Sequence, residues 1–286
     1  MSLPLIFIHR TPDNYLYYVL RQAKSSNPKS NIFLLGSESN RKYISDGMQH
    51  FLIENYFEGA SQFAKVYKHL SPLEYEYLLF CFQRWFVLRD FMERHNIEKC
   101  WVIDTDVMVF SDLNNPNFEK FTFEKNWNSI ISLKDIRDFC KVQMDSFNKN
   151  ASFENLKSYA LVRGHQRNNQ PLISDMVTMN LFFEKHLNRR RTNGIFSDSF
   201  FDTNLFLQFP GVEMAGKRKK IFLVDNQLYC KKNNSKELIK VNSIHFTTPQ
   251  NKRFIKHFYL QELNSLYKSG CFYFNYETSS WIETSL

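Results

Sequence analysis

Short apolar runs that alternate with helix-like patterns constrain the fold of this chain more than any other feature. Residues 3–9 and 31–36 read as buried strands, and the residues up to about Ala23 between them predict a helix that Asp13 or Asn14 would cap. Because strand, helix and strand follow one another within about 35 residues, the chain opens like a parallel α/β sheet. The pattern predicts a mixed, mostly parallel central sheet flanked by helices.

Later segments extend this pattern. We expect further strands at residues 51–56, 99–104, 129–133, 220–224 and 239–246. We expect helices at residues 71–95, 172–186, 199–207 and 249–266, and a loop or lid at residues 145–167. Neither a repeat nor a low-complexity linker divides the 286 residues, so we expect a single domain.

The composition supports a large core and argues against two common nucleotide folds. Hydrophobic residues make up 43% of the chain and aromatic residues 16%, which supplies an ample core and disfavours disorder. The chain has only 8 Gly, and neither GxGxxG nor GxxxxGK(S/T) occurs in it. Dinucleotide-dependent dehydrogenases and P-loop enzymes are therefore disfavoured.

The formal net charge is +8, and the excess is concentrated in two basic runs at residues 188–191 and 217–220. Such a balance suits sugar nucleotides, acidic glycans, anionic lipid surfaces or nucleic acid, although both runs could equally be solvated loops. The basic residues do not interleave with aromatic ones as in an RNA-recognition strand, and no helix-turn-helix pattern stands out. We therefore do not expect nucleic acid as a partner.

Five scattered cysteines without CxxC spacing are typical of free thiols in a reducing compartment. The first apolar run ends at His9 and has no basic segment before it, so we do not expect a signal peptide. No stretch approaches the roughly 18 apolar residues of a membrane span. We expect a cytoplasmic protein that can contact the inner face of the membrane peripherally.

Two carboxylates, Asp104 and Asp106, flank Thr105 where the predicted strand at residues 99–104 meets its exit loop. At the carboxyl end of a strand both acids can turn toward one cleft. Divalent cations prefer carboxylate oxygens, and such a cation neutralises the charge that develops on a leaving diphosphate. The motif predicts that Asp104 and Asp106 bind Mn²⁺ or Mg²⁺, with Asp104 also contacting a nucleotide sugar.

A late histidine and a late lysine are candidates to complete this site. His245 lies near the end of the predicted strand at residues 239–246, and an imidazole beside two carboxylates suits Mn²⁺. We expect His245 to be a third metal ligand, while a purely structural histidine is the alternative. Lys252 could reach a phosphate as a point charge, or could be an exposed helix lysine.

Other polar residues near predicted strands are candidate substrate contacts. Arg84, on the long helix before the acidic strand, could bind the diphosphate or orient Asp104. His9 and Arg10 follow the first strand and could contact the base or the ribose, because ligands bind at the carboxyl ends of strands. Asn40 follows the second strand and is a weaker candidate on the same rim.

An acceptor hydroxyl needs a base or a hydrogen-bonding anchor. Asp175, which begins a predicted helix in the sequence PLISDMVTMNLF, is the first candidate for this catalytic role. Its alternative is a capping acid, which that position favours. Asp202 is a second candidate, in a segment whose polarity looks loop-like.

Together, Asp104-Thr105-Asp106, the upstream Arg84 and the late His245 resemble a GT-A glycosyltransferase of the glycogenin and bacterial galactosyltransferase group. The resemblance covers roughly residues 3–252. It implies that Asp104, Asp106 and His245 bind one metal ion and that Arg84 lies at a donor-binding position. It also implies a GT-A (Rossmann-like) fold in which residues 1–110 bind the nucleotide sugar and residues 111–286 bind the acceptor.

Two departures accompany the resemblance. The His-x-Gly element of the group has no glycine here, because Thr247 and Thr248 follow Phe246, and the following lysine, Lys252, sits one place late. These departures indicate a distant family. The resemblance implies transfer of a hexose from a nucleotide-diphosphate sugar, expected to be a UDP-sugar, to a glycan or lipid-linked acceptor in bacterial surface-polysaccharide synthesis.

Two other classes of function stay open. Haloacid-dehalogenase-type phosphatases also carry Asp-x-Asp after an apolar strand, and their first Asp attacks phosphorus. That motif usually lies on the first strand and continues with Gly, whereas this one lies about a third of the way along and continues with Val107. A non-catalytic nucleic-acid-binding protein would instead bind generic DNA with a steep salt dependence.

Overall fold

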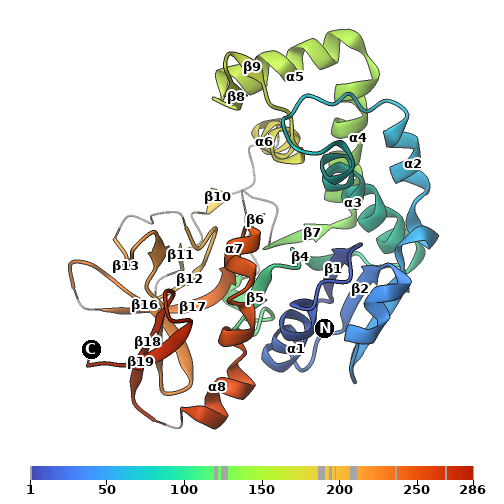
Figure 1. Ribbon diagram of the computed structural model, residues 1–286. Helices are drawn as coiled ribbons and strands as arrows, with labels where there is room; N and C mark the ends of the chain where they lie inside the picture. Colours follow the sequence, from blue (N-terminus) through green and yellow to red (C-terminus); the bar gives the residue numbers. More distant parts are fainter. Residues whose placement is uncertain are drawn as a thin grey trace.

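Two larger β-sheets and the helices around them make up the structure (Figure 1). It is a computed structural model that describes residues 2–118, 122–123, 128–185, 191–192, 195–196, 198–206, 211–235, 237–267 and 269–285. The first sheet has the order β3-β2-β1-β4-β7. Its strands are Leu5–His9 (β1), Ile32–Gly36 (β2), Met48–Leu52 (β3), Lys99–Ile103 (β4) and Asn128–Ser132 (β7). Because β1 to β4 run parallel and only β7 is antiparallel, the predicted mostly parallel sheet is confirmed.

The second sheet has the order β11-β12-β17-β16-β15-β18-β19, and β5 pairs with β17. Its strands are Val107–Val109 (β5), Ile195–Phe196 (β11), Ser199–Phe201 (β12), Phe222–Val224 (β15), Gln227–Lys231 (β16), Leu238–His245 (β17), Cys271–Asn275 (β18) and Ser280–Glu283 (β19). Three two-stranded pairs complete the described strands. They are Thr122–Phe123 (β6) with Arg191–Thr192 (β10), Gln166–Arg167 (β8) with Gln170–Pro171 (β9), and Met214–Ala215 (β13) with Arg218–Lys219 (β14).

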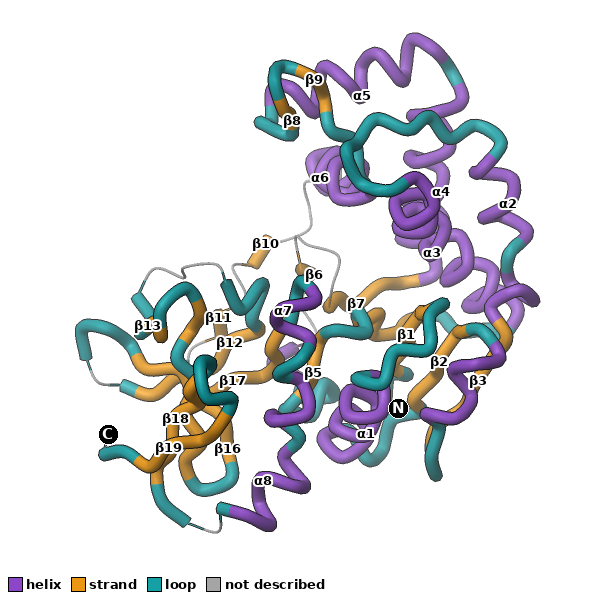
Figure 2. The backbone as a smooth tube through the Cα atoms, in the orientation of Figure 1, coloured by secondary structure: helices purple, strands orange, loops and turns teal. Residues whose placement is uncertain are grey.

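The helices gather mainly around the first sheet. The α-helices are Leu16–Ser26 (α1), Glu58–Ala64 (α2), Tyr75–Arg94 (α3), Leu133–Asn148 (α4), Asn150–Val162 (α5), Asp175–Lys185 (α6), Pro249–Lys252 (α7) and Leu260–Leu266 (α8). Short 3₁₀ helices are Glu38–Tyr43 (η1), Ile53–Tyr56 (η2), Pro116–Phe118 (η3) and Ile255–Phe258 (η4). Figure 2 shows α2 to α6 at one end of the molecule and the strands of the second sheet at the other. Across the described residues, none of the helices combines the length and the apolar character that a bilayer span requires.

The first sheet is buried on both faces, which explains its continuous apolar strands. Successive side chains of a strand point to opposite faces, so Leu5 and Phe7 pack in the core that contains α1 and the second sheet, while Ile6 packs in the core of α2 to α6. All three side chains are fully buried. Each burial of this kind stabilises the fold by about 1.5–3 kcal/mol.

Several sequence predictions need correction. Residues 145–167 are not a loop, because α4 continues to Asn148 and α5 follows it, burying Phe153, Leu156 and Ala160 along one face. The predicted helix at residues 199–207 is wrong over residues 199–206, and residue 207 lies outside the described residues. Residues 199–201 form β12, which pairs in parallel with β17. The long helix α3 begins only at Tyr75, since Glu74 caps it by accepting from the Tyr77 amide.

Smaller differences affect the ends of elements. Neither Asp13 nor Asn14 caps α1 with its side chain. The third strand lies at residues 48–52, and residues 53–56 form η2 instead. The predicted helix at residues 249–266 divides into α7, η4 and α8, and the β18–β19 hairpin follows it. Residue 186 of the predicted helix at 172–186 lies outside the described residues.

The basic run at residues 217–220 is largely used inside the fold. Arg218 lies over Phe206, 4.9 Å from the ring centroid, and Lys219 is buried beside Asp202. Lys220 pairs with Glu213 at 2.7 Å. These contacts leave little of the run to act as a basic surface. Most of the other run, residues 188–190, lies outside the described residues.

Candidate active site

Asp104, Thr105 and Asp106 form the link between the two sheets. The chain leaves the first sheet at the end of β4 and enters the second sheet at β5, and the Val107 amide donates to the Asp104 carbonyl at 3.0 Å to form the turn. The β5–β17 ladder sets His245 opposite Val107, and the Phe246 amide donates to the Asp106 carbonyl at 2.8 Å. Strand pairing therefore brings the late histidine beside the acidic motif.

The three predicted metal ligands converge. Asp104, Asp106 and His245 each offer one ligand atom, and these atoms all lie within 4.8 Å of one another. The His245 Nε2 atom is 3.3 Å from Asp106 Oδ1. Two carboxylates and one imidazole are donors that suit Mn²⁺ and, through the oxygens, Mg²⁺. The residues present therefore fit a divalent cation.

Asp104 is held from the helical side of the site. Arg84 on α3 donates from Nη1 to Asp104 Oδ1 and from Nη2 to Asp175 Oδ2, the latter at 3.1 Å. The indole of Trp85 donates to the same Asp175 oxygen at 3.1 Å. Burial raises the pKa of the Asp104 carboxyl, and the nearby Arg84 guanidinium only partly offsets this.

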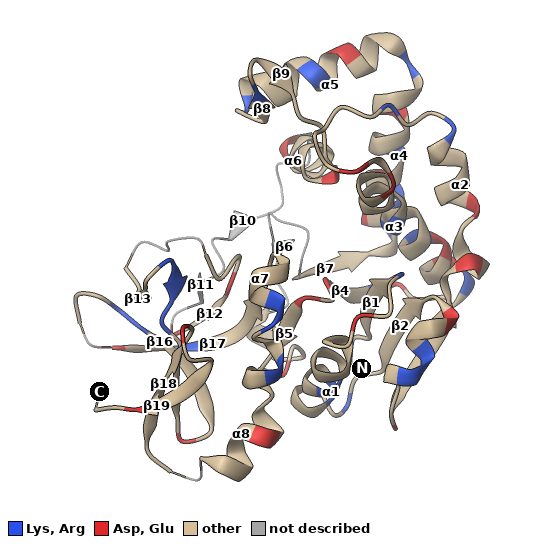
Figure 3. Cartoon of the chain, in the orientation of Figure 1, with Lys and Arg blue, Asp and Glu red and all other residues tan. Residues whose placement is uncertain are grey.

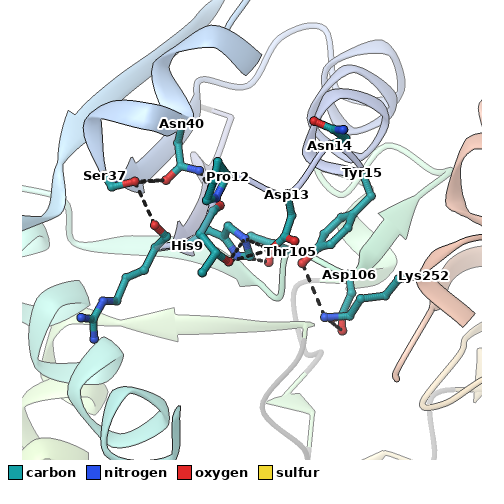
Figure 4. A network of polar contacts seen from close by, with 12 residues as sticks. His9, Pro12, Asp13, Asn14, Tyr15, Ser37, Asn40, Thr105, Asp106 and Lys252 are labelled. Carbon is teal, nitrogen blue, oxygen red and sulfur yellow. Dashed lines mark hydrogen bonds and ion pairs between the residues drawn. The ribbon is translucent and has the colours of Figure 1, made fainter. Parts of the chain in front are cut away.

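Asp106 is held from the side of the second sheet. Lys252 at the end of α7 places Nζ 3.1 Å from Asp106 Oδ2 and 3.5 Å from the Tyr15 hydroxyl (Figure 4). Burial acts to raise the pKa of Asp106, but His245 and Lys252 outweigh it and lower the pKa below its ordinary value. Burial raises the pKa of the Tyr15 phenol to about 12. In Figure 3 the acidic link between β4 and β5 lies beside α7, whose basic end is blue.

His9 at the end of β1 connects the acidic motif to the first loop. Its Nδ1 lies 2.8 Å from the Thr105 hydroxyl, and its Nε2 lies 2.8 Å from Asp13 Oδ2 (Figure 4). Thr11 also donates to Asp13, at 2.6 Å. Hydrogen bonding from His9 is the main reason that the pKa of Asp13 falls to about 2. The network fixes the loop that follows β1 against the acidic motif.

A cleft of about 560 Å³ opens above these residues. It is lined by Ile8, His9, Arg10, Thr11, Tyr15, Glu74, Glu76, Tyr77, Phe80, Cys81, Arg84, Asp104, Thr105, Asp106 and Lys252. The structure thus brings His9, Arg10, Arg84 and Lys252 to one cleft with the acidic motif. Arg10 is exposed on its rim, with the guanidinium 4.8 Å from the Phe80 ring centroid.

Asn40 does not reach the cleft. Its side chain is fully buried, and it donates to the Thr11 carbonyl at 2.7 Å and accepts from the Ser37 amide at 2.9 Å. In Figure 4 it lies behind the loop after β1. The prediction of a substrate contact is therefore corrected to a role in holding this loop, because no part of the amide is exposed to a ligand.

The two candidate catalytic acids lie in different surroundings. Asp175 begins α6 and lies beside Arg84, so it is close to the site, but its carboxylate accepts from Arg84 and Trp85. Asp202 is 1% exposed, and Lys219 Nζ lies 2.9 Å from its Oδ1. Because a buried, ion-paired carboxylate cannot touch a substrate, the prediction of a catalytic Asp202 is wrong in this geometry.

Sequence reasoning identified Arg84 but missed the rest of one wall of the cleft. One face of α3 forms this wall. Its residues lie three, four and seven positions after Tyr77, and they are Phe80, Cys81 and Arg84. This spacing could have identified the wall. The apolar residues at the neighbouring positions obscured it, because the helix is hydrophobic over much of its circumference.

Comparisons with known proteins give only distant likenesses. No protein-family model matches the chain, and no curated protein matches it. Among solved structures, mouse xyloside xylosyltransferase 1 in its apo form is similar with 7% identity and a TM-score of 0.47, over 65% of this chain and 83% of that one. The galactosyltransferase LgtC with donor and acceptor sugar analogs is similar with 14% identity and a TM-score of 0.30, over 62% of this chain and 70% of that one.

A third similar structure is the glycosyltransferase GlyE of Streptococcus pneumoniae TIGR4, with 14% identity and a TM-score of 0.31, over 64% of this chain and 44% of that one. All three proteins carry the name of a glycosyltransferase. At these identities and TM-scores the likeness carries no argument about what this chain does. A functional conclusion therefore has to rest on the site itself.

Proposed function

We propose that this chain is a metal-dependent glycosyltransferase that moves a hexose from a nucleotide-diphosphate sugar to a hydroxyl acceptor. One observation carries the proposal: Asp104 and Asp106 line a cleft beyond the carboxyl ends of parallel strands β1 and β4, and the buried His245 lies beside them. That is the place where open α/β sheets bind ligands. The cleft volume of about 560 Å³ lies within the range of small-molecule sites.

The side chains have distinct roles in this proposal. A divalent cation held by Asp104, Asp106 and His245 would supply the positive charge that a leaving diphosphate requires. Lys252 lies beside Asp106 and would add a second positive charge for the phosphates. Arg84 is already shared between Asp104 and Asp175, so it orients Asp104 rather than contacting the donor. Within this scheme Asp175 positions Arg84 and is not the base.

The finer parts of the proposal concern the substrates and their location. We propose a UDP-sugar as donor, bound mainly by residues 1–110 with His9 and Arg10 at the base and ribose. We propose a glycan or lipid-linked acceptor bound by residues 111–286, in bacterial surface-polysaccharide synthesis on the cytoplasmic side of the membrane. The net charge of +8 supports an anionic donor or acceptor.

Calorimetric titration with UDP, with and without Mn²⁺, tests the proposal. We expect Mn²⁺ to strengthen UDP binding to the wild-type chain by at least about 10-fold, because even groups that only orient metal ligands change metal affinity by that much. We expect Asp106→Ala to remove this gain in affinity. Asp138→Ala is the matched control, because Asp138 lies on α4 and pairs with Lys134 on the surface. Equal Mn²⁺-dependent affinity in wild type and Asp106→Ala would refute the assignment.

A thermal-shift screen of nucleotide sugars identifies the donor. Ligand at 100 times its Kd stabilises the folded state by about 2.7 kcal/mol, so the true donor stands out when Mn²⁺ is present. That donor is then incubated with the chain, and the sugar released from it is measured. Release of the sugar separates transfer chemistry from phosphate-ester hydrolysis. Release of inorganic phosphate from simple phosphate monoesters would instead favour the phosphatase class.

A further inference from the structure

The segment that follows β12 makes hydrogen bonds to His245 and its neighbours. The Asp202 amide donates to the Ser243 carbonyl at 3.0 Å, and the His245 amide donates to Asp202 Oδ2 at 3.2 Å. The Leu205 amide donates to the His245 carbonyl at 3.2 Å. Residues 202–205 therefore wrap around the end of β17, where His245 lies.

The same segment selects the nitrogen that His245 presents to the metal site. His245 Nδ1 lies 2.9 Å from the Thr203 carbonyl oxygen. A carbonyl oxygen can only accept, so Nδ1 carries the hydrogen. In the neutral ring the lone pair is then on Nε2, which lies 3.3 Å from Asp106. A metal-binding histidine is commonly fixed in this way through its other ring nitrogen.

Lys219 fixes the Thr203 carbonyl in turn. Its ammonium group lies 2.9 Å from Asp202 Oδ1 and donates to the Asn204 carbonyl at 2.6 Å. One cation therefore joins the residues on either side of Thr203. The side chains of Lys219 and Asp202 are each 1% exposed. The backbone of Lys219 is anchored as well, because its amide donates to the Leu205 carbonyl at 3.0 Å.

Stability alone does not account for this buried pair. Burying an ammonium group and a carboxylate costs several kcal/mol for each ion, and well-packed apolar residues in their place are often as stable or more stable. In some proteins a buried ion pair is retained because it fixes one arrangement of the chain. Here the arrangement that it fixes is the one that aims Nε2 of His245 at Asp106.

We propose that Lys219 is a positioning residue for the metal site, acting through Thr203 on the ring of His245. The inference rests on the proposed function in one respect, namely that Asp104, Asp106 and His245 bind a divalent cation. Lys219 itself touches neither metal nor substrate. Its role is to keep the turn at residues 202–204 in the form that holds the histidine.

Electron paramagnetic resonance of free Mn²⁺, titrated with folded protein and no nucleotide, tests the role. We expect Lys219→Met to weaken Mn²⁺ binding about 10-fold, at the lower end of the range for groups that orient metal ligands. Lys220→Met is the matched control, since Lys220 is the next residue, pairs with Glu213 and lies over the rings of Phe222 and Tyr273. It should bind Mn²⁺ as the wild type does. Wild-type affinity in folded Lys219→Met would overturn the inference.

A double-mutant cycle with His245→Ala shows whether the effect passes through the histidine. If Lys219 acts on His245, Lys219→Met causes no further loss of Mn²⁺ affinity once the imidazole is absent. Additive losses would contradict the proposed route. Should the wild type itself bind no Mn²⁺, the proposed function fails; if the wild type binds and both lysine variants bind equally, only this inference fails.

Lys219→Met leaves Asp202 as an unpaired buried charge and can unfold the chain for that reason. Asp202→Asn combined with Lys219→Met removes both charges and keeps an oxygen near the His245 amide. We expect the double variant to recover thermal stability while Mn²⁺ still binds about 10-fold more weakly than to the wild type, because the link that Lys219 makes between residues 202 and 204 is missing. Recovery of both thermal stability and Mn²⁺ affinity would show that the Lys219–Asp202 pair serves stability alone.

Discussion

The two aspartates of the acidic link lie two residues apart but belong to different surroundings. Asp104 faces the helices, where Arg84 joins it to Asp175. Asp106 faces the second sheet, where His245 and Lys252 approach it. Burial acts on both carboxyls, yet the pKa of Asp104 is raised and that of Asp106 is lowered. The two pKa values differ because His245 and Lys252 both favour the ionised form of Asp106, whereas Asp104 shares Arg84 with Asp175.

This contrast indicates that the two sides of the proposed metal site have different roles. The Asp104 side is built from α3 and α6, and its cation is tied between two carboxylates. The Asp106 side depends on a lysine whose side chain is 31% exposed and on the turn that leads to α7. We therefore expect substitutions of the residues that hold Asp104 to affect folding, and substitutions of the residues that hold Asp106 to affect ligand binding.

Arg84→Met should give the largest effect and should act on stability. Removal of the guanidinium takes away its ion pairs with Asp104 and with Asp175, whose side chain is 7% exposed. We expect a loss of about 3–5 kcal/mol in the free energy of unfolding, measured by urea denaturation. Arg94→Met, at the end of the same helix, should cost under about 1 kcal/mol. Equal stability of the two variants would contradict a structural role for Arg84.

Lys252→Met should affect ligand binding instead. Its partly exposed ion pair contributes no more than about 1 kcal/mol to stability. A lost hydrogen bond to a charged phosphate costs about 1.5–3 kcal/mol, so UDP should bind roughly 10–100-fold more weakly in the presence of Mn²⁺. Calorimetric titration measures the UDP affinity of Lys252→Met and of the control Lys256→Met, whose lysine is exposed. A variant that lost stability but kept its UDP affinity would reverse the comparison.

Thr248→Gly should have the smallest effect, and it should be stabilising. Thr248 lies between His245 and Lys252 with φ +72° and ψ 148°, a conformation that costs a β-branched residue about 1–3 kcal/mol. Glycine relieves the strain but gains freedom in the unfolded chain, which leaves a net gain of about 1 kcal/mol. Thr248→Ala keeps the Cβ atom and should not show this gain in thermal denaturation. Equal stability of the two variants would show that the turn is not strained.

Local patterns predicted the first sheet and the acidic link well. The apolar runs at β1, β2 and β4 are short, bounded and buried on both faces, so their strand character is plain in the sequence. The convergence of Asp104, Asp106 and His245 was also predicted, and the structure confirms their proximity. The ladder that achieves it joins β5 to β17, a pairing between distant segments that no local pattern specifies.

The second half of the chain was harder to predict because tertiary contacts decide its structure. Residues 199–201 have no strong periodicity and become a strand only beside β17. Lys219 stands in a run of four basic residues, which reads as a solvated loop, yet the fold buries it against Asp202. Asn40 shows the same limit, since a polar residue after a strand can hold a loop as well as contact a ligand.

Anomalous diffraction from crystals soaked with Mn²⁺ is the most direct test of the account. Its core is a cation seated where the exit loop of β4 meets the last residue of β17. The account predicts one strong anomalous peak in contact with oxygens of Asp104 and Asp106 and with Nε2 of His245. A fully occupied peak elsewhere, or no peak at these three side chains at saturating Mn²⁺, would contradict it.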